Sequence, residues 1–255
     1  MLTEEDRLLW EQQGLLHLPG FFPGAELQHW TDELALWPET PGRWMKYFED
    51  IQGARELCRV ENFLHYHGGW KSVIEHPVMS GVLETLFGEP RVLFKEKINF
   101  KLPGGSGFGA HQDAPAFATF GQQFHITAMV SIDATTRANG CLEVAYGRHR
   151  EGLLGMTESQ VLTEDVVNDL EWVPLETSPG DLVLFGSYLP HRSGPNTSSS
   201  ARRAAYLTFN PRRAGSCREK YYEDKRRVFP PEVERVPGRD YSDSGLYNIG
   251  NPIQE

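Results

Sequence analysis

The chain has 255 residues, 39% of them hydrophobic, and a formal net charge of −10, which argues against nucleic acid as the main partner. Three widely spaced cysteines, an acidic N-terminal segment and the lack of a long apolar run argue against a disulfide framework, a signal peptide and a membrane span. We therefore expect a cytoplasmic protein, and its oligomeric state cannot be read from the sequence.

The first part of the chain, about residues 1–90, is predicted to be mainly helical. Thr3 can cap a short helix that ends near Gly14, and LLHLPGFF then reads as extended. The segment AELQHWTDELALW has apolar residues at helical spacing, and a further helix over PVMSGVLETLF is expected to stop at Gly88.

From residue 91 the pattern changes to strands. RVLFKEKINFKL alternates as a half-buried strand does, and FHITAMVSIDA, GCLEVAYG, DLVLFGSYL and RAAYLTFNP follow, separated by turn-rich segments. This pattern predicts an antiparallel barrel or double sheet over about residues 91–213. An irregular extension follows over 214–255. We expect residues 1–255 to form a single domain that is mainly β with flanking helices.

Two polar residues stand in a run of small and apolar ones, KLPGGSGFGAHQDAPAF. His111 and Asp113 would point the same way in an extended strand, so they could hold a metal or form a surface polar pair. The facial triad that binds Fe(II) needs a second histidine. His191 is the strongest candidate, because it lies at the far end of the strand predicted by SPGDLVLF. Arg202, at the start of the next strand, could hold a dicarboxylate by a two-pronged ion pair.

Four motifs in order, HQD, NGCLEVAYGRHR, SPGDLVLFGSYLPHRSGPN and RRAAYLTF, resemble the phytanoyl-CoA dioxygenase family over roughly residues 8–213. The resemblance implies a double-stranded β-helix of the jelly-roll, cupin-like type. It also implies a hydroxylase that uses Fe(II), 2-oxoglutarate and O2, with no catalytic residue beyond the metal ligands. The implied metal ligands are His111, Asp113 and His191. The implied cosubstrate contacts are Arg202, with Arg203 as an adjacent alternative, and Gln112, Thr127 and Ser193.

The residues leave the substrate open. The strand FKEKINFKL carries Lys and Asn at alternate positions on one face, which could be solvated or could direct Lys97 or Asn99 toward an anion. In GRWMKYFED, Trp44 and Tyr47 stand near acidic residues; they could hold an ammonium group by cation–π contact, or simply pack in a helix. These four residues are the substrate-binding candidates.

Three further stretches, WMKYFED, FKEKINFKLPGG and LYNIGNPI, are similar to a bacterial branch of the family that serves phosphonate catabolism. That branch hydroxylates 2-aminoethylphosphonate or its N-trimethyl analogue at the carbon next to phosphorus. One alternative is a hydroxylase of another small molecule, such as an amino acid, a compatible solute or a natural product. Others are a non-catalytic metal-binding β-sandwich module and a zinc hydrolase.

Overall fold

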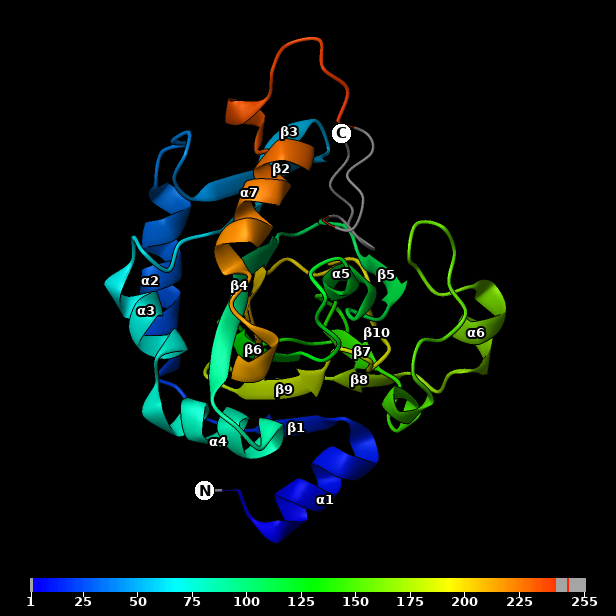
Figure 1. Ribbon diagram of the computed structural model, residues 1–255. Helices are drawn as coiled ribbons and strands as arrows, with labels where there is room; N and C mark the ends of the chain where they lie inside the picture. The colour runs from blue at the N-terminus through cyan, green and yellow to red at the C-terminus, as the bar shows by residue number, and fades with distance from the viewer. Residues whose placement is uncertain (1, 242–246, 248–255) are drawn as a thin grey trace.

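The computed structural model describes residues 2–241 and 247, which form two antiparallel sheets with helices around them (Figure 1). The α-helices in this part are α1 (Glu4–Gln13), α2 (Gly24–Leu36), α3 (Gly68–Ile74), α4 (Pro77–Phe87), α5 (Pro115–Ala118), α6 (Glu164–Asp169) and α7 (Arg218–Val228). Short 3-10 turns cover Arg148–Glu151, Arg212–Ala214 and Glu232–Glu234. Among the described residues, no helix combines the length and apolar character that a bilayer crossing demands.

The larger sheet has the strand order β1-β9-β6-β11-β4-β3-β2, and the smaller sheet has the order β5-β10-β7-β8. All neighbouring strands are antiparallel. The larger sheet contains β1 (Leu15–Leu18), β2 (Met45–Ile51), β3 (Ala54–Glu61), β4 (Arg91–Lys101), β6 (Ile126–Ser131), β9 (Leu182–Gly186) and β11 (Arg202–Pro211). The smaller sheet contains β5 (Phe108–His111), β7 (Leu142–Val144), β8 (Val173–Leu175) and β10 (His191–Ser193). The expected mainly-β fold with flanking helices is confirmed.

Local signals explain the helices that the sequence predicts. Thr3 and Asp6 form a reciprocal capping box at the start of α1, with hydrogen bonds of 3.1 and 2.7 Å. The same helix ends at Gly14 in the left-handed conformation, as α4 does at Gly88. Helices α2 and α4 also fall where the apolar spacing placed them.

The prediction of mainly helical elements up to about residue 90 is wrong for residues 45–61. They form the hairpin β2–β3, which extends the larger sheet beyond β4. The hairpin turns at Gln52 and Gly53, whose φ angles are 56° and 84°. Two positive φ angles are typical of a type I′ turn. Such turns are usually predicted from an Asn-Gly or Asp-Gly dipeptide, and this turn has Gln-Gly instead.

The two faces of the larger sheet serve different purposes. On β4, Ile98 and Phe100 pack into the main core together with α2, α3 and α4. The alternate β4 residues Lys97, Asn99 and Lys101 point instead toward the smaller sheet. Strand alternation therefore directs this polar row into the space between the sheets, which decides against a solvated strand face.

Candidate metal centre and the cavity around it

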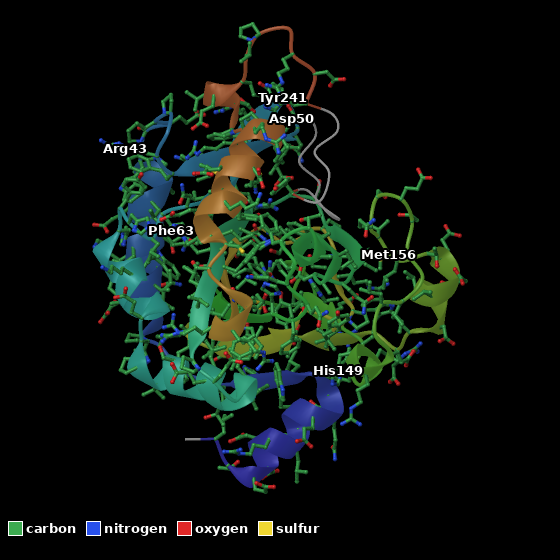
Figure 2. All side chains as sticks on the ribbon, viewed as in Figure 1. Arg43, Asp50, Phe63, His149, Met156 and Tyr241 are labelled. Atoms are coloured by element: carbon green, nitrogen blue, oxygen red, sulfur yellow. The ribbon has the colours of Figure 1, made fainter. Side chains whose placement is uncertain are left out.

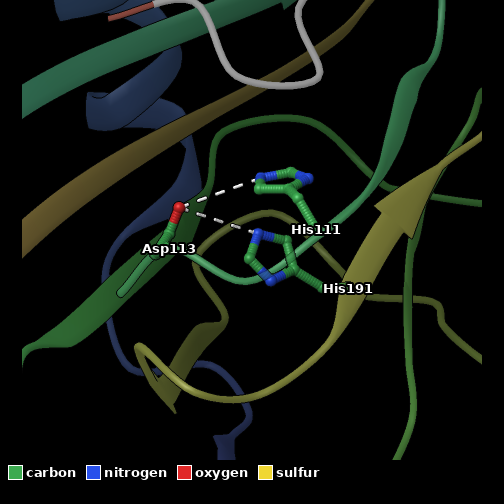
Figure 3. A group of neighbouring side chains, drawn as sticks. All are labelled: His111, Asp113 and His191. Atoms are coloured by element: carbon green, nitrogen blue, oxygen red, sulfur yellow. Dashed lines mark ion pairs between the residues drawn. The ribbon is translucent and has the colours of Figure 1, made fainter. Parts of the chain in front are cut away.

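Two neighbouring strands of the smaller sheet bring two histidines together. His111 ends β5, His191 begins β10, and the two residues are register partners with ring centroids 4.2 Å apart. Asp113 follows β5, and its Oδ1 lies 3.8 Å from His111 Nε2 and 4.0 Å from His191 Nε2 (Figure 3). One potential ligand atom from each residue lies within 4.8 Å of the others, so one ion could contact all three.

The hydrogen bonds of the two imidazoles suit metal binding. His111 Nδ1 lies 2.7 Å from the carbonyl oxygen of Gly109, and His191 Nδ1 lies 2.9 Å from that of Leu189. A carbonyl oxygen only accepts, so each Nδ1 carries the proton and donates it. The lone pair of each Nε2 is then free and directed toward the Asp113 carboxylate.

The electrostatic surroundings favour a neutral His111 and an ionised Asp113. Burial, together with the neighbouring His191, lowers the pKa of His111 to about 3, so its ring is neutral at neutral pH. Burial raises the pKa of Asp113, but the two imidazoles and the Lys95 and Lys97 ammonium groups outweigh burial and hold the pKa at about 2. Neutral imidazoles with an ionised carboxylate are the donor set of mononuclear non-heme iron sites, and these residues fit it.

The two other histidines close to the sequence motifs are used elsewhere. His125 Nε2 lies 2.6 Å from Gln122 Oε1, and its ring stacks on Phe117. His149 lies beside Gly14 at the end of α1, near the edge of the molecule (Figure 2). Within the described residues, the His111–Asp113–His191 group is the one cluster with metal-ligand geometry.

A cavity between the two sheets opens onto the metal ligands. Four residues named from the sequence line it: Lys97, Asn99, Thr127 and Ser193. It is also lined by residues that sequence reasoning did not assign to the site: Lys95, Phe108, Leu142, Arg192, Tyr206 and Thr208. Alternation along β4 and β11 could have found Lys95, Tyr206 and Thr208, since each lining residue on these strands is two positions from the next. The other three lie on strands of the smaller sheet, where no such signal applied.

Arg202 is fully buried and does not itself line the cavity, but it lies next to the end of the cavity that Tyr206 lines. Its Nη2 donates to the Tyr206 hydroxyl at 3.1 Å, while its buried Nε has no partner among the described residues. Lys101 stands opposite on β4 and donates to Ser193 Oγ at 2.8 Å and to the Gly194 carbonyl at 2.6 Å. Burial and the Arg202 charge lower the pKa of Lys101 to about 7. This end of the cavity suits a carboxylate.

Arg203 does not share this position. It bonds the Asp133 carboxylate through Nε at 2.7 Å and forms a further ion pair with Asp32. The side chain therefore lies on the opposite face of β11, as alternation predicts.

Gln112, between two of the candidate ligands, is held away from the cavity. Its amide donates to the carbonyl oxygens of Gly152 and Tyr188 at 2.9 and 2.7 Å, and accepts from the Leu154 amide at 2.9 Å. The side chain thus anchors the loop after the 3-10 turn, and it does not line the cavity.

Trp44 and Tyr47 are not brought to the cavity either. The Tyr47 hydroxyl donates to the Phe229 carbonyl at 2.9 Å, and the two rings stack 5.2 Å apart. Trp44 packs on Trp37 and donates from its indole nitrogen to the Pro38 carbonyl at 2.8 Å. Both side chains thus use their polar atoms in contacts within the protein. Tyr47 lies on strand β2 and Trp44 directly before it, so neither lies in a helix.

Comparison with known proteins identifies relatives over the whole length. A family model described as phytanoyl-CoA dioxygenase matches residues 10–204. A 2-aminoethylphosphonate dioxygenase from the uncultured bacterium HF130_AEPn_1 is 50% identical, over 99% of this chain and 98% of its own. A methylphosphonate hydroxylase of Gimesia maris is 37% identical, over 100% of this chain and 98% of its own.

Solved structures of low sequence identity share the fold. EctD from S. alaskensis, crystallised with 2-oxoglutarate and 5-hydroxyectoine, matches with a TM-score of 0.71 at 18% identity. The match covers 82% of this chain and 76% of that chain. The likeness confirms the jelly-roll architecture that the family resemblance implied, and it agrees with the double sheet that the strand pattern predicted.

Proposed function

We propose a reaction and a substrate from one premise: this chain belongs to the phytanoyl-CoA dioxygenase family. It is accordingly an Fe(II)- and 2-oxoglutarate-dependent dioxygenase. The proposed reaction is hydroxylation of the carbon next to phosphorus in 2-aminoethylphosphonate or its N-trimethyl analogue. The observation that carries this proposal is the cavity that joins His111, Asp113 and His191 to Lys97 and Asn99. The 50% identical relative named 2-aminoethylphosphonate dioxygenase supports the same substrate.

In this proposal, His111, Asp113 and His191 would hold Fe(II), and Arg202 would hold the far carboxylate of 2-oxoglutarate. The bound metal and cosubstrate supply O2 activation coupled to decarboxylation of 2-oxoglutarate to succinate and CO2. Ser193 and Thr127, which line the cavity, are proposed as further cosubstrate contacts.

The chain's own residues bind, orient and shield. The carbonyl oxygens of Gly109 and Leu189 fix the two imidazole rings through their Nδ1–H groups. Lys97 and Asn99 bind the phosphonate and orient the adjacent carbon toward the metal ligands. The free thiols of the cysteines support a cytoplasmic location for this chemistry.

A simpler alkylphosphonate is the second candidate. The methylphosphonate hydroxylase relative aligns over the whole chain, and Lys95 and Lys97 line the cavity as potential donors to a phosphonate. Both candidate substrates contain a phosphonate group, so the activity on each must be compared directly to distinguish them.

The test is succinate formation by Fe(II)-reconstituted protein with 2-oxoglutarate and O2. The panel contains 2-aminoethylphosphonate, its N-trimethyl analogue, methylphosphonate and small amino acids. We expect phosphonate-stimulated succinate that His111→Ala abolishes and that His29→Ala, which alters an exposed helical histidine, retains. Stimulation by an amino acid alone would keep the reaction and reject the substrate. Absence of succinate with every compound would reject both.

A further inference from the structure

A buried chain of polar groups lies beside the β4 residues that line the cavity. Lys225 of α7 donates to Glu61 Oε1 at 2.6 Å, and Arg59 Nη1 lies 3.4 Å from the same oxygen. Arg59 Nε in turn donates to Asn99 Oδ1 at 3.1 Å. All four side chains are buried, so these contacts form away from solvent. The chain of bonds links helix α7 to a residue of the cavity wall.

Strand pairing sets up this arrangement. Arg59 is the register partner of Asn99 across the antiparallel pair β3–β4, and Glu61 is the partner of Lys97. Paired residues present their side chains on the same face of a sheet, at contact distance. The hairpin β2–β3 therefore places Arg59 and Glu61 beside Asn99 and Lys97 on the same face of the larger sheet.

The bond from Arg59 determines what the Asn99 amide offers to a ligand. A primary amide has one accepting oxygen and two N–H donors. Because Asn99 Oδ1 already accepts from Arg59, the group left for the cavity is the NH2 donor pair. A flipped amide would set the NH2 group against the Arg59 cation and turn the oxygen toward the ligand.

The neighbouring wall residues are donors as well. Lys97 Nζ lies 5.4 Å from the centre of the Tyr206 ring, and Lys95 Nζ lies 5.2 Å from that of Phe117. Neither ammonium group has a hydrogen bond or an ion pair with any described residue. Together with the Asn99 NH2 group they form a wall of donors, which complements the three oxygens of a phosphonate.

We infer that Arg59 is a positioning residue that fixes Asn99 as a hydrogen-bond donor to the phosphonate oxygens of the substrate. The inference rests on the proposed function and deepens it, since it assigns phosphonate recognition to Lys95, Lys97 and the Arg59-oriented amide. Loss of Arg59 frees the amide to present its oxygen to an anion. One lost hydrogen bond to a charged group corresponds to about a tenfold rise in Kd.

A double-mutant cycle tests the inference through binding. The proteins are wild type, Arg59→Met, Asn99→Ala and the double variant, each loaded with Fe(II) and 2-oxoglutarate in the absence of O2. Calorimetry gives the Kd of 2-aminoethylphosphonate, and a separate titration gives that of 2-oxoglutarate. We expect Arg59→Met to raise the phosphonate Kd about tenfold in the wild-type background and little in the Asn99→Ala background. The Kd of 2-oxoglutarate should stay unchanged.

Two further variants separate positioning from general damage. Arg91→Met removes an arginine of β4 that is bonded to the Ile74 carbonyl and the Ser80 hydroxyl and lies outside the cavity, and it should leave the phosphonate Kd unchanged. Asn99→Asp keeps an acceptor for Arg59 but replaces the NH2 donors with an oxygen. It should weaken phosphonate binding more than Asn99→Ala does. This comparison does not use Arg59→Met, so it tests the donor role of Asn99 even if that variant fails to fold.

The possible failures differ from one another. Three results would overturn the role of Arg59 and leave the phosphonate substrate in place. They are additive effects of the two substitutions on the phosphonate Kd, a wild-type Kd in Arg59→Met, and tight phosphonate binding by Asn99→Asp. Wild-type protein that binds 2-oxoglutarate but no phosphonate overturns the proposed substrate and the inference together.

Discussion

At the scale of single residues, Arg202 is a buried charge without a carboxylate partner among the described residues. Its guanidinium is fully buried, its Nε has no partner, and no carboxylate among the described residues forms an ion pair with it. A buried charge without a counter-ion is costly, and a bound anion offsets that cost. Lys101 stands beside it and adds to the positive potential. Both features support the proposal that this end of the cavity receives the far carboxylate of 2-oxoglutarate.

Replacing this arginine should therefore act on the cosubstrate. We expect Arg202→Gln to raise the KM for 2-oxoglutarate roughly tenfold to a hundredfold, because it removes charged hydrogen bonds. Initial rates at varied 2-oxoglutarate give the value, with Arg203→Gln on the opposite face of β11 as the control. An unchanged KM in Arg202→Gln would place the cosubstrate carboxylate elsewhere.

At the scale of elements, a buried ion pair joins the C-terminal helix to the added hairpin. Lys225 of α7 and Glu61 of β3 are both almost fully buried, with 2.6 Å between Nζ and Oε1. Burial raises the pKa of Glu61, but the Lys225 and Arg59 cations outweigh burial and lower the pKa to about 2. The ionised Glu61 carboxylate thus contributes to stability, whereas burial lowers the pKa of its partner Lys225 to about 8, and the pair anchors α7 to the strand beside the cavity wall.

This carboxylate predicts a specific acid sensitivity. Its folded-state pKa, about 2, lies below the ordinary value of 4.5, so Glu61 stabilises the fold above pH 4.5 and loses this effect as the pH falls toward 2. Glu61→Gln should cost about 3 kcal/mol of unfolding free energy at pH 7, and the difference from wild type should shrink below pH 4.5.

Urea unfolding at a series of pH values measures both quantities. Glu75→Gln, on the exposed surface next to Lys71, is the control and should change stability by less than about 0.5 kcal/mol. A difference between wild type and Glu61→Gln that stays constant with pH would contradict the assigned pKa.

At the scale of the whole molecule, the site is a junction between the two sheets. His111 and His191 come from the smaller sheet, while Lys97, Asn99 and Arg202 come from the larger one. A metal and a cosubstrate held between them would cross-link the sheets in the folded state only. Such ligands raise apparent stability by mass action.

Metal removal should therefore lower the melting temperature. With Fe(II) and 2-oxoglutarate at about a hundred times their Kd, each contributes about 2.7 kcal/mol, which corresponds to a shift of several degrees. Differential scanning calorimetry in the absence of O2, with and without a chelator, measures the shift. The chelator should have no effect on His111→Ala, and an equal shift in that variant would place the metal outside the predicted triad.

Much of this protein follows from its sequence alone. Helix caps, apolar spacing and strand alternation act over a few residues, and they predict α1, α2, α4 and the long strands of the β-core, while the ordered motifs indicate the fold class. The helix α7 was not predicted, because it lies in the extension after residue 213 that was expected to be irregular. The sequence also names the residues His111, Asp113 and His191 that the structure brings within 4.8 Å of each other. Their iron binding stays a prediction.

Tertiary structure decided what depends on contacts between distant segments. The Gln52–Gly53 turn carries a weak local signal, so only pairing with β4 reveals the hairpin. Packing against Phe229 takes Tyr47 away from the cavity, and loop carbonyls take up the Gln112 amide. Arg59 gains its role only by standing opposite Asn99 in the sheet. Hydrogen-bond partners are set by three-dimensional neighbours, and residue type and spacing do not specify them.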